Sequence, residues 1–160
     1  MTNKKIKYPD SFNKAPLEKK VEMIFEWMGY DVEWNRCFQS YQVDIFVKKK
    51  DDLCDDFEYW LCIICHGDSK LEMDVVSTLV KTRTIAREEL KTSKYDCVDC
   101  QGMIISENES SFSREAILEA NLHNIELMTL KKLLDAHERF MKEKERLIRH
   151  IESLEKEYKK

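Results

Sequence analysis

The longest apolar run of the chain covers residues 59–66, reads Tyr-Trp-Leu-Cys-Ile-Ile-Cys-His and ends in a histidine. A run of this length, preceded by charged residues and followed by Gly67, predicts a buried central strand. Because alternate side chains of a strand share a face, Ile64 and His66 are expected on one face of the sheet and Cys65 on the other. The rest of the fold is expected to be built around this strand.

Shorter patterns before and after this run predict the remaining elements. Apolar residues recur at helical spacing from Leu17 to Met28, after Pro16, and Gly29 ends this helix. Period-two alternation predicts strands at 30–35 and 43–48. The later patterns predict a helix at 73–92, a strand at 102–106, a helix that is capped by Ser111 or Ser113 and ends at His123-Asn124, and a strand at 125–130. This order of helices and strands predicts an α/β three-layer sandwich.

The chain divides into three parts. Residues 1–13 are polar and are expected to be a flexible N-terminus, residues 14–134 are expected to form one domain, and residues 135–160 a charged C-terminal helix. From Leu133 onward, two sets of residues recur at intervals of seven: Leu133, Phe140, Leu147 and Leu154, and His137, Lys144, Ile151 and Tyr158. This seam indicates either a coiled coil that makes a homo-oligomer or a linker to a further module.

Composition narrows the classes of protein that the chain can represent. The net charge of -4 means that contact with nucleic acid would need a local basic patch. The lysines near the start are followed by no apolar signal segment, and no run has the roughly 18 apolar residues of a membrane span. We therefore expect a cytoplasmic protein with no membrane partner.

Six cysteines include two C-x-x-C pairs, Cys62 with Cys65 and Cys97 with Cys100. This spacing occurs in zinc sites, where tight turns aim both sulfurs at one point. Residues three apart in a strand face opposite sides of the sheet, so Cys62 and Cys65 are not expected to share a metal. In a chain without an export signal, buried free thiols are expected instead.

Several segments together resemble one known family. They are Leu-Glu-Lys-Lys-Val at 17–21, Met-Gly-Tyr at 28–30, Val-Asp-Ile-Phe at 43–46, the run at 59–66, Gly-Met-Ile-Ile-Ser at 102–106, Phe-Ser-Arg-Glu-Ala at 112–116 and Ile-Glu-Leu at 125–127. From Leu17 to Leu134 the chain resembles the Mrr-type restriction endonuclease domain of the PD-(D/E)XK nuclease superfamily. The resemblance implies a restriction-endonuclease-like α/β/α sandwich with a mixed sheet, from a prokaryotic antiphage defence or signalling protein.

The chemistry of this family explains the residues that it requires. Two carboxylates from neighbouring strands hold a divalent cation, usually Mg²⁺, that activates a water for attack on phosphate. A lysine two residues after the second carboxylate shares its strand face and stabilises developing negative charge. By resemblance, Glu18 is the helix carboxylate and Asp44 the first metal ligand. Where the family has glutamate or glutamine and then lysine, this chain has Ile64 and His66, so the resemblance implies an impaired catalytic site.

Three outcomes remain open for this site. Asp68 and Lys70 repeat the spacing of carboxylate and lysine four positions later, although the glycine before them is expected to end the strand first. Alternatively, His66 joins Glu18 and Asp44 around Mn²⁺ or Zn²⁺, which accept imidazole more readily than Mg²⁺ does. In the third outcome, which is the leading hypothesis, catalysis is lost, no cofactor is bound and the fold serves binding.

A group of basic residues offers a contact for nucleic acid. One side of the helix predicted from Met73 to Thr92 is partly lined by Lys81, Arg83, Arg87 and Lys91. Such a row would bind phosphate groups without sequence preference. The alternative is a solvated helix face that Glu88 and Glu89 balance. The implied partners are double-stranded DNA, a signalling NTPase module or another protein, and a second copy of the chain.

These observations support three functional hypotheses. The leading one is a catalytically impaired nuclease-like domain that binds nucleic acid or a protein. The second is an active DNA endonuclease that uses Mg²⁺ or Mn²⁺ in a rearranged site, and the third is a homodimeric assembly module. Analogy of fold does not separate them, because one scaffold hosts unrelated functions.

Overall fold

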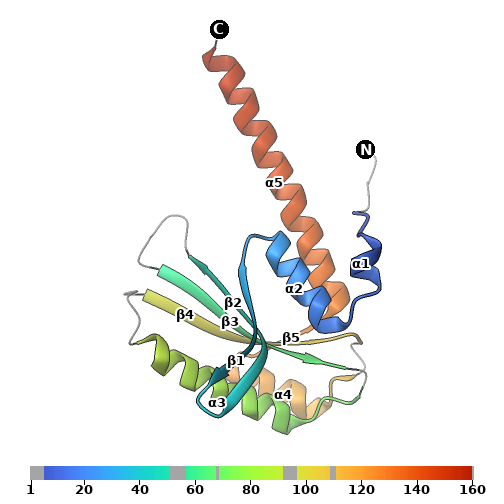
Figure 1. Cartoon of the computed structure of the whole chain (residues 1–160), viewed down its shortest axis with the longest axis vertical. Coiled ribbons are helices and arrows are strands. Elements are labelled where there is room, and N and C mark those ends of the chain that lie inside the picture. Colours follow the sequence, from blue (N-terminus) through green and yellow to red (C-terminus); the bar gives the residue numbers. More distant parts are fainter. Residues whose placement is uncertain (1–5, 51–56, 68, 92–96, 109–110, 160) are drawn as a thin grey trace.

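A five-stranded sheet forms the centre of the computed structural model, which describes residues 6–50, 57–67, 69–91, 97–108 and 111–159 (Figure 1). Its strands, whose spatial order equals their chain order, are β1 (Asp31–Phe38), β2 (Tyr41–Lys50), β3 (Phe57–His66), β4 (Cys97–Ser106) and β5 (Glu126–Thr129). The first three strands pair antiparallel, whereas β3, β4 and β5 pair parallel. The sheet is therefore mixed, as expected.

Helices pack against both faces of this sheet. On one face lie α3 (Met73–Leu90) and α4 (Arg114–His123), and on the other lie α2 (Leu17–Trp27) and the first part of α5 (Leu130–Tyr158). Each face buries its own cluster of apolar side chains. The predicted α/β class with a long C-terminal helix is confirmed.

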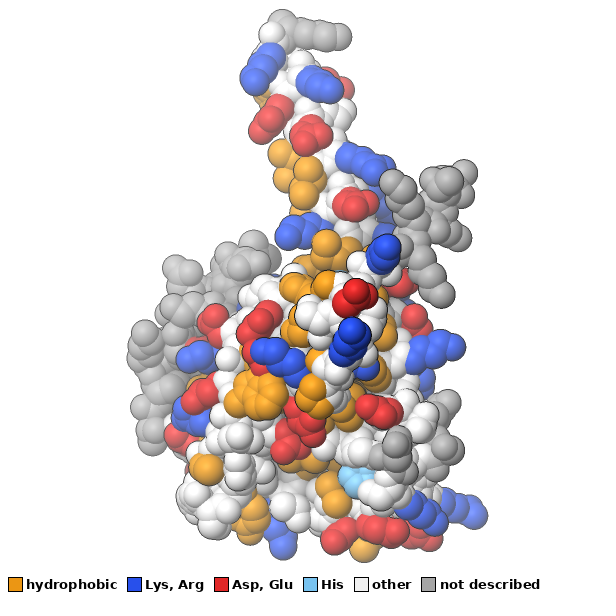
Figure 2. All heavy atoms as spheres, turned by 45° about the vertical axis from the view of Figure 1, so that its right-hand side comes forward, with side chains coloured by type: hydrophobic (Ala, Val, Ile, Leu, Met, Phe, Trp, Pro, Cys, Tyr) orange, Lys and Arg blue, Asp and Glu red, His pale blue; other side chains and the backbone are white. Residues whose placement is uncertain are grey.

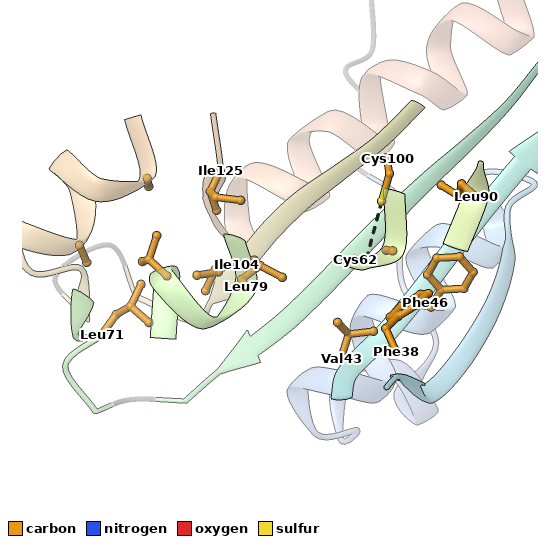
Figure 3. Close-up of a cluster of buried hydrophobic side chains, with 14 residues drawn as sticks. Phe38, Val43, Phe46, Cys62, Leu71, Leu79, Leu90, Cys100, Ile104 and Ile125 are labelled. Carbon is orange, nitrogen blue, oxygen red and sulfur yellow. Dashed lines mark hydrogen bonds between the residues drawn. The ribbon is translucent and has the colours of Figure 1, made fainter. Parts of the chain in front are cut away.

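Strand β3 is buried between β2 and β4, and its side chains alternate between the two clusters. Cys62 and Ile64 belong to the cluster under α3, and Figure 3 shows Cys62 among the other members of that cluster. Leu61, Ile63 and Cys65 pack into the cluster under α2. The predicted alternation of the run at 59–66 is confirmed, including the placement of Cys62 and Cys65 on opposite faces.

Strand β2 departs from the predicted alternation at Asp44. Val43 packs under α3, whereas Ile45 packs under α2, although the two residues are two positions apart. The β1–β2 ladder pairs Trp34 with Ile45 and Arg36 with Val43, and Asn35 stands between them with a φ of 51°. A left-handed residue twists the strand locally, and the regular pattern predicted for 43–48 is wrong at Val43 for this reason.

The N-terminal segment contributes to the core, in contrast to the flexible segment predicted for residues 1–13. The helix α1 (Asp10–Asn13) carries Phe12, which is 3% exposed. Tyr8 stacks on Phe12 at 4.8 Å and on Trp27 at 5.8 Å between ring centroids, and its hydroxyl lies 3.0 Å from Nδ1 of His137. These contacts join the segment to α2 and α5, while residues 1–5 lie outside the described residues.

The helix α5 is continuous across the predicted domain boundary at residue 134. It begins at Leu130, directly after β5, and the hydroxyl of Thr129 accepts a hydrogen bond from the backbone of Lys132 at 3.2 Å. Its buried residues, Leu133 and His137, lie in the first two turns, and the remainder projects from the domain (Figure 1). None of the described helices combines the length and the apolar character needed to cross a membrane.

We expect Phe12→Ala to lower the free energy of unfolding by about 3 kcal/mol, because it removes a buried ring from a cluster of aromatic side chains. Chemical denaturation followed by circular dichroism measures the change. Leu122→Ala is the control, since that side chain is 73% exposed and its loss should change stability by no more than about 0.5 kcal/mol. A Phe12→Ala variant as stable as the wild type would show that the segment is not part of the folded domain.

Candidate functional site

Two acidic residues meet at the edge of the cluster under α2. Glu18 lies in the first turn of α2, after Pro16, and Asp44 lies at the irregular position of β2. The Oδ2 atom of Asp44 accepts a hydrogen bond of 2.8 Å from the backbone N–H of Cys65 on β3. The β2–β3 ladder ends where Ile45 pairs with Ile63, so the Asp44 side chain takes the place of a main-chain acceptor for Cys65.

Burial and charge both act on Asp44. Burial raises the pKa of its carboxyl, the N–H of Cys65 lowers this pKa, and the negative charge of Glu18 raises it again. The two carboxylates are therefore close enough for their charges to interact. Among the described residues, no lysine or arginine contributes to the shift of the Asp44 pKa. The site thus combines two carboxylates, and no described lysine or arginine side chain acts on the Asp44 carboxyl.

The third side chain of the site is Cys65. Burial raises the pKa of its thiol well above the ordinary value, and the charges of Asp44 and Glu18 raise it further. The thiol is therefore protonated at neutral pH, and a protonated thiol is neither a good nucleophile nor a good metal ligand. The residue two positions before it on the same face is Ile63, which is fully buried.

The structure places Ile64 and His66 differently from the positions that the resemblance implies. Ile64 packs into the cluster under α3, on the face opposite Cys65. Nε2 of His66 lies 2.8 Å from the carbonyl oxygen of Ser69, in the loop after β3. Within the described residues, no three His, Cys, Asp or Glu side chains form a group that could hold a metal ion, so Glu18, Asp44 and His66 are not brought together as one.

The alternative pair, Asp68 and Lys70, follows the end of β3. The strand ends at His66, as expected from Gly67, and Lys70 is exposed in the loop beyond it. Asp68 lies outside the described residues. The loop position of Lys70 means that strand geometry does not hold it beside Asp44.

The four basic residues at and near α3 do not form one exposed row. Arg83 is 6% exposed and donates a hydrogen bond to the carbonyl of Asn124 at 3.3 Å. Nε of Arg87 donates to the carbonyl of Cys100 at 3.1 Å, and Lys91 forms an ion pair of 2.8 Å with Glu88. The spacing that aligned these residues also coincides with the buried stripe of the helix, which contains Leu79, Ala86 and Leu90.

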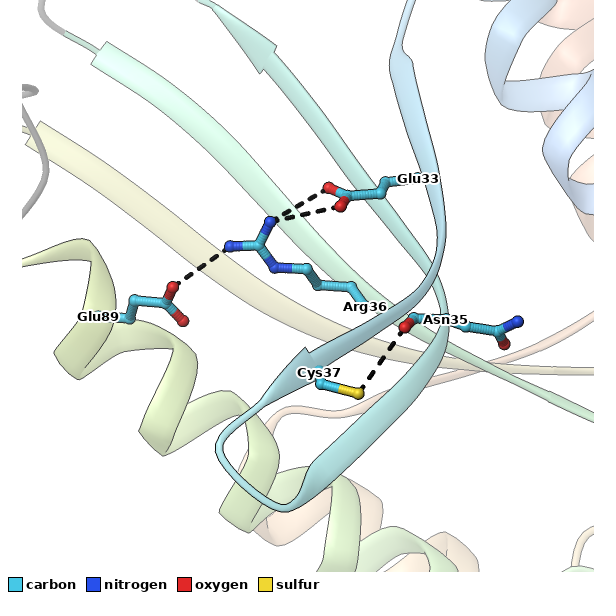
Figure 4. A network of polar contacts seen from close by, with 5 residues as sticks. All are labelled: Glu33, Asn35, Arg36, Cys37 and Glu89. Atoms are coloured by element: carbon cyan, nitrogen blue, oxygen red, sulfur yellow. Dashed lines mark hydrogen bonds and ion pairs between the residues drawn. The ribbon is translucent and has the colours of Figure 1, made fainter.

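Two further contacts were not predicted from the sequence. The thiols of Cys62 and Cys100 lie 4.0 Å apart in the cluster under α3 (Figure 3), and the hydrogen bond between them together with burial raises the pKa of Cys62. Arg36 forms ion pairs with Glu33 at 3.3 Å and Glu89 at 3.2 Å, which connects β1 with α3 (Figure 4). The contacts of Cys62 with Cys100 and of Arg36 with Glu89 join segments that are distant in the chain, and the local sequence carries no signal for them.

Comparisons with family models, with curated proteins and with solved structures found no match to the chain. The class that the structure defines is an α/β protein with a five-stranded mixed sheet and a long C-terminal helix.

We expect Asp44→Asn to raise the free energy of unfolding at pH 7, because asparagine keeps an acceptor for the Cys65 N–H and removes a charge that burial disfavours. A raised pKa in the folded state means that ionisation costs stability as pH rises, so the gain should shrink as pH falls toward about 4. Asp44→Ala should instead lose about 1–3 kcal/mol, because it leaves that N–H without its acceptor. Denaturation at several pH values measures both changes.

Asp31→Asn is the matched control for this prediction, because Asp31 is an exposed aspartate on β1. Its free energy of unfolding at pH 7 should stay within about 0.5 kcal/mol of the wild-type value. An Asp44→Asn variant that is less stable than the wild type at pH 7 would mean that the ionised carboxylate stabilises the fold.

Proposed function

We propose that the chain is a restriction-endonuclease-like three-layer domain that has lost metal-dependent hydrolysis and acts by binding a partner. The observation that carries this proposal is the face that β3 turns toward Asp44. A nuclease of this type needs a carboxylate and a lysine on that face, and Ile63 and Cys65 stand there instead.

The remaining groups are poorly suited to the chemistry. Glu18 and Asp44 supply two acidic side chains, but Asp44 already accepts a hydrogen bond from the backbone of Cys65. Isoleucine has no lone pair for a metal, and the protonated thiol of Cys65 carries no positive charge to stabilise a phosphate transition state. Activation of water and stabilisation of charge are therefore both weakened.

A protein is the favoured partner over nucleic acid. The chain has a net charge of -4, and Arg83 and Arg87 donate hydrogen bonds to carbonyl oxygens of the fold itself. Phosphate binding needs several basic side chains that are free to neutralise the backbone of the nucleic acid. By resemblance, the setting is a prokaryotic defence or signalling protein, in which a signalling NTPase module or another protein would be the partner.

An active DNA endonuclease is the second candidate, and the closeness of Glu18 and Asp44 favours it. Two carboxylates whose charges repel at a partly buried position attract a divalent cation. Glu18 and Asp44 would hold Mg²⁺ or Mn²⁺, which would supply polarisation of the phosphate. The chain's own residues would then have to position the water without a neighbouring lysine.

We expect no cleavage of supercoiled plasmid DNA by the wild-type chain in Mg²⁺ or in Mn²⁺, because the face of β3 supplies neither a ligand nor a cation. Agarose gel analysis of nicked and linear products measures this. Asp44→Asn is the matched variant, since it removes the charge and keeps the hydrogen bond to Cys65. Cleavage by the wild type that is absent from Asp44→Asn would establish the second candidate instead.

We also expect no binding of a DNA duplex by about 10 µM protein at about 0.15 M salt, since Lys81 and Lys91 alone make too few phosphate contacts. Fluorescence anisotropy of a labelled duplex measures binding. Replacing both Lys81 and Lys91 by glutamine tests the helix, with the same change at Lys142 and Lys156 on α5 as the control. Binding at this salt that is lost only in the first variant would make nucleic acid the partner.

A further inference from the structure

The helix α5 extends well beyond the domain. Residues 142–159 are all exposed, and at 1.5 Å per residue the segment from 142 to Tyr158 is about 25 Å long. Figure 1 shows this part continuing without a bend away from the sheet and from α2. This part of the helix has no tertiary packing against the described residues, so its stability in water depends on other contacts.

One side of this projecting part is apolar. Its exposed large apolar side chains are Leu147, Ile148, Ile151, Leu154 and Tyr158, of which Leu147 is 62% and Tyr158 91% exposed. Figure 2 shows hydrophobic side chains gathered along the helix above the domain. Charged side chains border this stripe, and among them Arg146 pairs with Glu143 at 3.2 Å. Spacings of four and three residues are those of a coiled-coil seam.

The same seam continues down the helix into the domain. Leu133 and His137 precede Leu147 and Ile151 by two heptads, and both are buried on the α2 side of the fold. The ring of His137 lies 5.6 Å from that of Trp27. An α-helix drifts by only about 40° over two heptads, so the apolar stripe lies on the side of α5 that its own domain occupies.

This placement decides which helix orientation a second copy can take. In a parallel pair, residues 130–140 of each copy would have to occupy the space of the other copy's domain. Lys144 would also face Lys144 of the partner subunit in the seam, and like charges there are unfavourable. In an antiparallel pair, the partner's domain lies beyond Tyr158, where it meets no obstacle from the described residues.

We propose that residues 142–158 pair with the same segment of a second copy of the chain as an antiparallel coiled coil. The register that covers the stripe sets Ile151 against Leu154 of the partner subunit and Leu147 against Tyr158 of the partner subunit. It also sets His150 beside Glu157 of the partner subunit, twice in the symmetric pair, where the imidazole N–H can donate a hydrogen bond to the carboxylate. This proposal uses no residue of the candidate site and stands whether or not the domain cleaves DNA.

The mass of the full chain in solution tests the pairing. Sedimentation equilibrium of the wild type is expected to show twice the 19.2 kDa mass of the chain. Leu154→Glu should raise the dissociation constant about 100-fold, because it places a charge in each half of the seam. Ser153→Glu adds the same charge on the outer face and should leave the dimer intact. A wild type that stays monomeric at about 0.1 mM overturns the proposal and leaves the stripe to a helix of another protein.

Two further measurements test the orientation. Small-angle X-ray scattering of the wild type is expected to show two lobes at opposite ends of an elongated particle, and two adjacent lobes would overturn the antiparallel arrangement. Glu157→Lys should weaken the dimer, because it removes the carboxylate that accepts from His150 of the partner subunit, and adding His150→Glu should restore it by placing a carboxylate beside the new lysine. Failure of the second change to restore pairing would overturn the register. Circular dichroism of each variant confirms that the domain remains folded.

Discussion

The burial of β3 on both faces is the constraint on which the rest of the structure depends. A strand with an antiparallel neighbour on one side and a parallel neighbour on the other has main-chain partners along most of its length. Its side chains must then fill two separate clusters, and Cys62 and Ile63 do so with no exposed surface. Polar groups on such a strand would need partners or a metal, because unpaired charge in an apolar cluster is costly.

Each of the two helical layers covers one of the apolar clusters. The layer of α3 and α4 closes one cluster, and the basic side chains of α3 bind carbonyl groups of the fold there. The layer of α2 and α5 covers the other cluster. Contacts of Tyr8 and Trp27 with His137 hold the first turns of α5 against α2 and the N-terminal segment. Burial lowers the pKa of His137, so the ring is neutral in this packing. The fixed base determines the direction in which the free part of α5 points.

The spacing of apolar and polar residues along the sequence predicted the features of the fold that depend on neighbouring residues. The faces of β3, the helix from Leu17 and the end of the central strand at His66 follow from spacing and from single glycine or proline residues. The burial of Arg83 was missed because four-residue spacing describes both a charged row and the apolar stripe of the same helix. The aromatic cluster was missed because its rings come from three segments that are distant in the chain, and no pattern within one segment reveals that meeting.

The candidate site brings two acidic side chains together, and among the described residues no lysine or arginine contributes to the shift of the Asp44 pKa. Strand β2 is irregular at Asp44, across the ladder from Asn35, which has a left-handed conformation. At this position the side chain of Asp44 lies near Glu18 and Cys65. Asp44 has a structural role there, because it accepts the N–H of Cys65 beyond the last pair of the β2–β3 ladder. Its presence is therefore explained without catalysis. Its neighbour Glu18 lies in the first turn of α2, where the helix dipole favours a carboxylate, and the negative charge of Glu18 raises the pKa of Asp44.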